Sequence, residues 1–214
     1  MSKKVKIQKP IINNILENID DVADTIYEKE AIEDSLIENI NINGIEDVKV
    51  KFNTCIFKNT TFEYCNFKKS DITDVVFENC DLSNINFSDS GLYRVEFINC
   101  KLIGARFDDS VLTSVTFKDS ICKFSNFAFS KFKGVNFEGS DCQSSVFQDV
   151  INEKLLLNSV NLNKSVFTGM KLSDVDFTNC SIEDIELTLK DIKGAKFTVV
   201  QALDLTRLMG IVIQ

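Results

Sequence analysis

The sequence predicts an all-β solenoid, and three regularities support that prediction. Sixteen of the 18 phenylalanines lie at positions of the form 5n+2, and from 52 to 197 only Asn152 among the 30 such positions is not Phe, Leu, Ile or Cys. Small or β-branched residues dominate the 5n positions, two residues earlier. Neither a helical period of 3.6 nor a strand period of 2 produces this phase. The repeating unit is therefore five residues long, with two inward positions.

The five-residue units combine into coils of four. At a spacing of 20 one inward column reads Phe at 57, 77, 97, 117, 137, 177 and 197 with Leu157, and the columns beside it are rich in Leu and Ile. Gly, Asn or Asp fills 17 of the 30 positions of the form 5n+4, which predicts a corner after each short extended piece. One unit cannot bury its own inward residues, so successive coils must stack. Thirty units make about 7.5 coils, or 8.5 with an imperfect first coil, and a rod of roughly 36 Å at ~4.8 Å per coil.

Composition excludes several functional classes. The chain has 24 Lys+Arg, 32 Asp+Glu and no His, a net charge of −8. An acidic chain is unsuited to gripping phosphate backbones, so we expect no direct nucleic-acid binding. Without His the common catalytic triads and most zinc sites are excluded, and a convex rod offers no natural substrate cleft. We expect no enzyme activity, cofactor, metal or small-molecule substrate. Without an apolar stretch of about 20 residues or a signal segment, we expect a cytoplasmic protein with no membrane contact.

The seven cysteines fit the core rather than a redox or metal site. Five lie at 5n positions and two at 5n+2, so all seven are inward. A free cysteine behaves as a small apolar residue in such a core. The odd number and the parallel side-chain directions argue against disulfides between stacked pairs such as Cys80 and Cys100.

Units such as Cys80–Asn84 and Cys100–Gly104 make the sequence resemble the pentapeptide-repeat superfamily. The resemblance covers about residues 50–199, extends to about 30, and implies a right-handed quadrilateral β-helix. The segment from Gln201 to Ile213 is similar to the tail of bacterial quinolone-resistance (Qnr-like) pentapeptide proteins and of uncharacterised homologues in low-GC bacteria. That resemblance implies a homodimer and binding to DNA gyrase or topoisomerase IV as a DNA-like rod.

The two ends interrupt the repeat, so we divide the chain into a tail and cap (1–30), a solenoid (31–199) and a C-terminal segment (200–214). Thr198 to Gln201 has capping-box spacing, which predicts a helix to about Met209 followed by a left-handed Gly210. Its apolar residues either cap the last coil or form a dimer interface. The predicted interface comprises Leu205, Leu208, Met209, Ile211, Val212 and Ile213.

Three irregular regions leave alternatives open. After Pro10, apolar residues from Ile12 to Ile26 follow a helical period, which predicts a helix capping the first coil; an extended strip along the rod is the alternative. The five-residue phase breaks at Asp47, which predicts a loop or bulge near 45–49. Asn152 stands on an inward column, where we expect a distorted coil with the Asn bonding backbone groups; a bulge that forms a site is the alternative.

Phe124 and Phe129 are the two phenylalanines at outward positions, both at 5n+4 on one coil, and so are candidates for a partner surface. Residues 50–199 carry 17 positive and 20 negative side chains, a net of −3, so the rod is only weakly acidic. Two functional hypotheses follow. The first is a non-catalytic rod that binds a type II topoisomerase; the second is an interaction scaffold with an unrelated partner.

Overall fold

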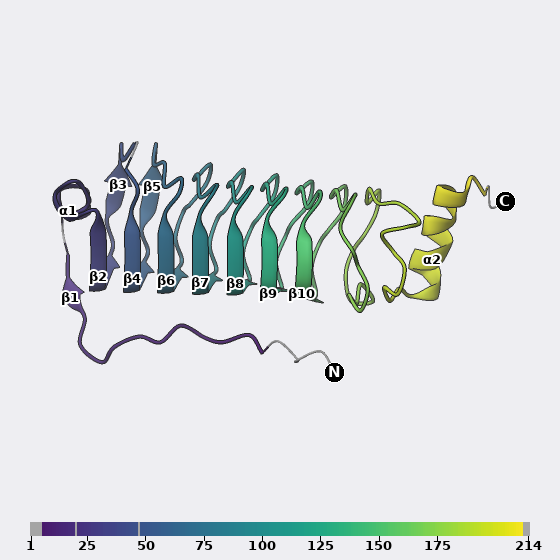
Figure 1. Cartoon of the computed structure of the whole chain (residues 1–214), viewed down its shortest axis with the longest axis horizontal. Coiled ribbons are helices and arrows are strands. Elements are labelled where there is room, and N and C mark those ends of the chain that lie inside the picture. Colours follow the sequence, from purple (N-terminus) through teal and green to yellow (C-terminus); the bar gives the residue numbers. More distant parts are fainter. Residues whose placement is uncertain (1–5, 20, 47, 212–214) are drawn as a thin grey trace.

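The computed structural model describes residues 6–19, 21–46 and 48–211, and it shows a parallel β-solenoid (Figure 1). An eight-stranded sheet has the order β1-β2-β4-β6-β7-β8-β9-β10, and β3 pairs with β5. The strands are β1 (Glu17–Asn18), β2 (Ala31–Glu38), β3 (Asn41–Asn43), β4 (Lys51–Lys58), β5 (Thr61–Glu63), β6 (Asp71–Glu78), β7 (Gly91–Ile98), β8 (Val111–Lys118), β9 (Lys131–Glu138) and β10 (Ile151–Asn158).

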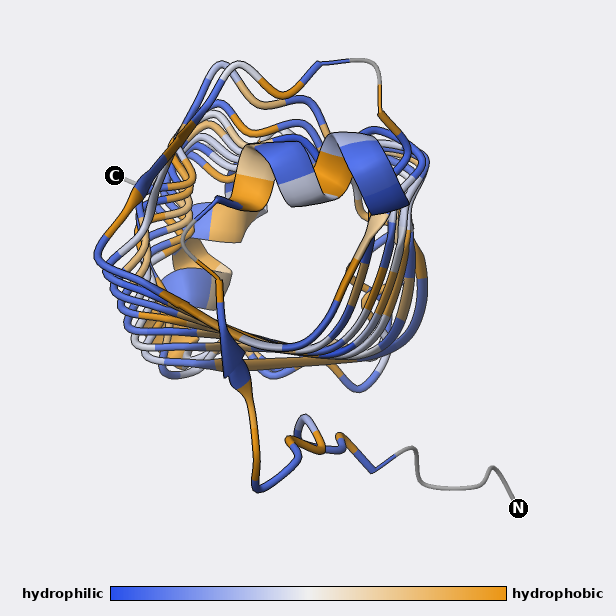
Figure 2. Ribbon diagram, turned by 90° about the vertical axis from the view of Figure 1, so that its left-hand side faces the viewer, coloured by the Kyte–Doolittle hydropathy of each residue, from blue (hydrophilic) through white to orange (hydrophobic). Residues whose placement is uncertain are grey.

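The register confirms the 20-residue coil. Phe57 pairs with Phe77, Phe77 with Phe97, and Phe97 with Phe117, all in parallel. On the remaining faces single parallel bridges, such as the one between Asn86 and Arg106, repeat the same spacing. Figure 2 looks along the rod and shows the coils as a four-sided outline. The repeats match a right-handed quadrilateral β-helix, as predicted.

Stacked aromatic rings form the core. In one column neighbouring rings lie 4.6–5.0 Å apart and within 10° of parallel. The column contains Phe57, Phe77, Phe97, Phe117 and Phe137, and a second column contains Phe67, Phe87, Phe107, Phe127, Phe147 and Phe167. Rings of the two columns meet edge to face, for example Phe117 and Phe127 at 5.7 Å and 83°. The square section is therefore filled by the two aromatic columns and the Leu/Ile columns between them.

The corners lie at the 5n+4 positions, as predicted. Left-handed backbone recurs there from Asp34 (φ 48°) to Gly194 (φ 85°). At one corner Asn side chains bond from coil to coil: Nδ2 of Asn79 donates to Oδ1 of Asn59 at 3.2 Å, and Nδ2 of Asn99 to Oδ1 of Asn79 at 2.7 Å. Asn tolerates the left-handed conformation and supplies both a donor and an acceptor, so the ladder continues in register.

The N-terminal region combines the two predicted alternatives. Helix α1 (Val22–Lys29) lies across the first coil (Figure 2), with Val22 and Ile26 buried and the Asp21 side chain as its N-cap. Residues 6–19 are not helical, so the helical period was wrong for Ile12–Ile19. They run along the side of the rod toward its middle, and β1 pairs with β2 (Figure 1). Ile12 and Leu16 are half-buried there, a burial that the apolar period satisfies equally well as an extended strip.

Of the two predicted irregularities, the loop or bulge near 45–49 adds no net residue to its coil, whereas the distortion at Asn152 is present. Ala31 pairs with Lys51, so the first coil has the usual 20 residues. Asp47 itself lies outside the described residues. In β10 the register to β9 shifts on either side of Lys154, and Nδ2 of Asn152 donates to the Lys171 carbonyl at 3.2 Å. The expected distorted coil with Asn bonding the backbone is thus confirmed.

The C-terminal helix α2 (Val199–Leu205) continues as the 3₁₀ helix η1 (Thr206–Met209) and ends at left-handed Gly210 (φ 70°), as predicted. The capping box is present: the Gln201 N–H donates to Oγ1 of Thr198 at 3.2 Å, and the Thr198 N–H donates to Oε1 of Gln201 at 2.8 Å. Among the described residues no helix is long and apolar enough to cross a membrane.

Candidate protein-binding surfaces

Many charges along the rod are paired between neighbouring coils. Nζ of Lys51 lies 2.6 Å from a carboxylate oxygen of Glu33, and Nζ of Lys123 lies 3.1 Å from one of Asp141. Four further lysines have a carboxylate 20 residues away within 4.0 Å: Lys58, Lys101, Lys118 and Lys196. Such exposed pairs contribute little to stability. They do place positive charges beside negative ones on neighbouring coils.

The exposed large apolar residues in the middle of the rod lie on two neighbouring coils, residues 91–110 and 111–130. Between residues 65 and 150 they all fall within 103–129, and we term them the mid-rod belt: Ile103, Val111, Ile121, Phe124 and Phe129. The predicted pair Phe124 and Phe129 are 62% and 56% exposed. Both have left-handed backbone, φ 59° and 60°, where a bulky residue is unusual. The corners they occupy flank a face on which Ala128 is buried.

The inner side of the C-terminal segment caps the last coil of the rod. Nε2 of Gln201 donates to the carbonyls of Phe177 and Cys180, both at 2.9 Å, and Leu205 is buried against the same rod. Leu208 packs partly against the core, and Arg207 bonds Asp184 at 3.0 Å. These contacts satisfy backbone groups that the last coil would otherwise leave open.

The outer side of the cap stays uncovered. Of the predicted interface residues Met209 and Ile211 are exposed there, whereas Val212 and Ile213 lie outside the described residues. Val199, Val200 and Leu203, which the sequence argument did not select, are also exposed, at 79%, 70% and 50%. We term Val199, Val200, Leu203, Met209 and Ile211 the outer cap face.

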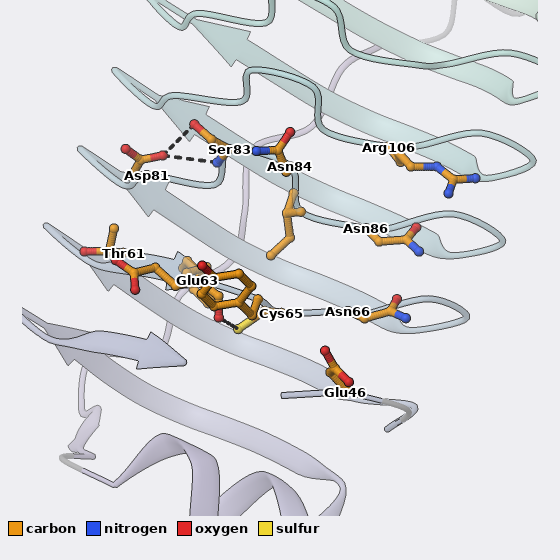
Figure 3. A pocket seen from close by; sticks show the side chains of 13 residues that line it. Glu46, Thr61, Glu63, Cys65, Asn66, Asp81, Ser83, Asn84, Asn86 and Arg106 are labelled. Carbon is orange, nitrogen blue, oxygen red and sulfur yellow. Dashed lines mark hydrogen bonds between the residues drawn. The ribbon is translucent and has the colours of Figure 1, made fainter. Parts of the chain in front are cut away.

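An open groove lies near the N-terminal end, between Glu46, Tyr64, Asp81 and Arg106 (Figure 3). Its polar side chains are engaged in local turns. Oδ1 of Asp81 accepts from the Ser83 N–H at 3.1 Å and from its hydroxyl at 2.6 Å, and the Asn66 and Asn86 side chains accept from the N–H two residues on. The groove therefore shows turn chemistry and no nucleophile with an adjacent base.

The cysteines are core residues, in agreement with their phase. Six are buried and Cys180 is half-buried, all as free thiols. Burial raises the pKa of Cys55 to about 11 and raises the pKa of Cys142 and Cys180 as well. Thiols held neutral in this way are poor nucleophiles. Among the described residues no three His, Cys, Asp or Glu side chains gather as metal ligands do.

A buried ion pair holds the N-terminal strip, residues 6–19, against the rod. Asp74 forms a bidentate pair with Arg94, whose Nε lies 2.6 Å from Oδ1, and the Ile11 N–H donates to the same oxygen at 2.8 Å. Arg94 also stacks on the Tyr93 ring at 4.2 Å. Further along, Nδ2 of Asn13 donates to Asp34 at 2.7 Å. Sequence reasoning missed this cluster, although Asp74 and Arg94 are corner residues 20 positions apart.

This geometry lowers the pKa of Asp74. Burial alone would raise it, but the hydrogen bonds from Arg94 and Ile11 and the charge of Arg94 leave the pKa below its ordinary value. The Asp74 carboxylate is therefore charged at neutral pH and joins the strip to two coils of the rod.

Comparison with known proteins agrees with this architecture. The profile described as "Pentapeptide repeat region" matches residues 48–127, 70–147 and 90–167, which together span more than half of the chain. A search of curated proteins finds no match. Among solved structures a trypsin-treated QnrB1, described as a plasmid-mediated fluoroquinolone resistance protein, is similar with a TM-score of 0.59 and 18% identity, covering 84% of this chain and 100% of that one. HetL, a pentapeptide repeat protein from the cyanobacterium Nostoc, matches with a TM-score of 0.30 and 9% identity over 84% of this chain and 94% of its own. The five-residue phase, the stacked coils and the profile matches together place the chain in the pentapeptide-repeat family.

Proposed function

We propose that the protein is a non-catalytic, dimeric rod that binds a type II topoisomerase, DNA gyrase or topoisomerase IV. The observation that carries the binding role is the mid-rod belt, because it places several large apolar side chains at the surface of the rod. Large aromatic side chains are preferred anchors at protein interfaces. The fluoroquinolone-resistance role given for QnrB1, together with the shared rod shape, makes a topoisomerase the first partner to test.

The outer cap face supports the dimer. Its five apolar residues lie beyond the contacts that close the last coil, so capping does not account for them. Two copies joined there would form a longer rod with one mid-rod belt on each half. Recognition would then depend on shape and on the belt more than on negative charge, because residues 50–199 carry a net charge of only −3.

The test is a gyrase supercoiling assay with the purified protein, with and without a fluoroquinolone. We expect inhibition, or relief of drug inhibition, at low micromolar protein, and loss of the effect in Phe124→Ser/Phe129→Ser. Tyr64→Ser is the matched control, since Tyr64 is a 79% exposed aromatic at the same corner as Phe124 but three coils away. No effect from the folded protein at tens of micromolar contradicts the topoisomerase proposal.

The dimer is tested separately by light scattering. We expect Val200→Glu/Met209→Glu to convert the dimer to a monomer without changing its thermal stability, because neither side chain packs against the rod. A wild-type monomer, or a variant that remains dimeric, contradicts this interface.

The alternative function is a scaffold for an unrelated partner, which the same belt favours. Affinity capture with the wild-type protein and with Phe124→Ser/Phe129→Ser distinguishes the two. A partner other than a topoisomerase that is lost only in the double variant supports the scaffold.

A further inference from the structure

A groove opens on the side of the rod where the regular ladder ends. Asn152 replaces an apolar residue of the inward column, the register shifts at Lys154, and β10 is the last described strand of the large sheet. In the following coils residues 189–194 form turns. The Leu172 N–H donates to the Asp191 carbonyl at 3.1 Å, which joins these turns to the preceding coil.

Three lysines line this groove, which we term the lysine groove. It is lined by Lys171, Ser173, Lys190 and Lys193, together with the buried residues Leu172 and Asp191. Nine lysines elsewhere on the chain lie within 4.0 Å of a carboxylate. Within the described residues none of the three groove lysines has such a partner, so their charges are uncompensated on a chain of net charge −8.

The carboxylate in the groove is already engaged. Oδ2 of Asp191 accepts from the Thr188 N–H at 2.9 Å and from its hydroxyl at 2.7 Å, and the residue is buried. Its bonds therefore serve the 188–191 turn. The nearby Glu153 lies 2.9 Å from Lys131, outside the groove. Three lysines against one aspartate leave the lining residues with an excess of two positive charges.

We propose that the lysine groove binds the phosphate group of a small ligand. Lysine ammonium groups are compact point charges that suit phosphate, and a concave wall concentrates their field. The Ser173 hydroxyl supplies a neutral donor beside them. A dianionic phosphate matches the excess of two charges, whereas a single carboxylate would leave one uncompensated. This proposal is independent of the topoisomerase proposal, since the groove lies beyond the mid-rod belt.

The test is isothermal titration calorimetry of the full chain with inorganic pyrophosphate, and with citrate as a carboxylate probe of comparable charge. We expect pyrophosphate to bind more tightly than citrate. Lys171→Gln/Lys190→Gln/Lys193→Gln should weaken it by at least about tenfold, because charge-assisted hydrogen bonds are roughly twice as strong as neutral ones.

The matched control is Lys29→Gln/Lys69→Gln/Lys164→Gln, which removes three exposed lysines outside the groove and changes the net charge equally. Affinity of this control within twofold of wild type supports the site. Equal weakening in both triple variants would show a general charge effect and overturn it. Equal affinity for citrate would overturn the phosphate assignment, and so would the absence of pyrophosphate binding at millimolar concentration.

Discussion

Replacing Phe117 with Ala tests whether the aromatic columns stabilise the rod. The Phe117 ring is fully buried and lies 4.9 Å from Phe97 and 4.6 Å from Phe137, each within 7° of parallel. It also meets Phe107 and Phe127 edge to face at 5.7 Å. Truncating a buried Phe costs about 3–5 kcal/mol. We expect about 4 kcal/mol, because hydrogen-bonded coils on both sides prevent the cavity from collapsing.

A loss of that size lowers the melting temperature by roughly 8–16 °C for a chain of this length. Urea unfolding followed by circular dichroism gives the free energy directly, and a thermal scan gives the shift. Phe124→Ala is the control on the same coil, since its ring is 62% exposed and we expect a loss below about 1 kcal/mol. If Phe117→Ala costs no more than Phe124→Ala, the aromatic columns do not hold the coils together.

Three further predictions concern single contacts. Asp74→Asn should release the N-terminal strip, which hydrogen exchange would show as faster exchange at the Ile11 amide. Because the folded state lowers the pKa of Asp74, the carboxylate's contribution to stability is complete above about pH 4, where the unfolded carboxyl titrates, and is lost as the pH falls through the folded-state pKa. Asn152→Leu should stabilise the rod by about 1–2 kcal/mol in urea unfolding, because Oδ1 of Asn152 is buried without a partner. Destabilisation would mean that the bond from Asn152 to the Lys171 carbonyl contributes more than the unpaired oxygen costs. Gln201→Ala should cost about 2 kcal/mol, since it removes two bonds to the last coil and the side-chain acceptor of the Thr198 N–H in the capping box; an unchanged melting temperature would contradict the capping role.

The solenoid was predictable because its constraints repeat along the sequence. Each inward position is filled by the same kind of side chain every 20 residues, so the spacing of residues such as Phe77 and Phe97 predicts the length of a coil from the sequence alone. The helix α1 was predictable in part, because Asp21 is a good N-cap and Val22 and Ile26 lie on one helical face.

The N-terminal strip was not predictable from its apolar spacing. Ile12 and Leu16 are four residues apart, which fits a helix, yet they are also half-buried in the extended strip. The Asp74–Arg94 pair favours the extended conformation, because Asp74 offers an acceptor to the Ile11 N–H. Such a contact depends on the finished surface of the rod and leaves no periodic signal.

The orientation of the C-terminal helix was also beyond the sequence. Leu205 belongs to an apolar face that fits a cap or an interface equally well. The two bonds from Gln201 to backbone carbonyls fix the helix so that Leu205 faces its own rod while Leu203 faces outward. A single buried amide therefore decides which apolar residues remain exposed.

The left-handed corners of the rod accept several kinds of side chain. A left-handed corner costs most residues about 1–2 kcal/mol, and Asn reduces that cost and adds ladder bonds, as Asn79 and Asn99 do. Phe124 and Phe129 occupy the same conformation, yet more than half of each side chain is exposed. Their positions are therefore not explained by backbone preference, by a ladder or by full burial. Because they flank one face of a single coil, the partner proposed above would have to lie across that face to cover both, and Phe124→Ser/Phe129→Ser would remove that contact.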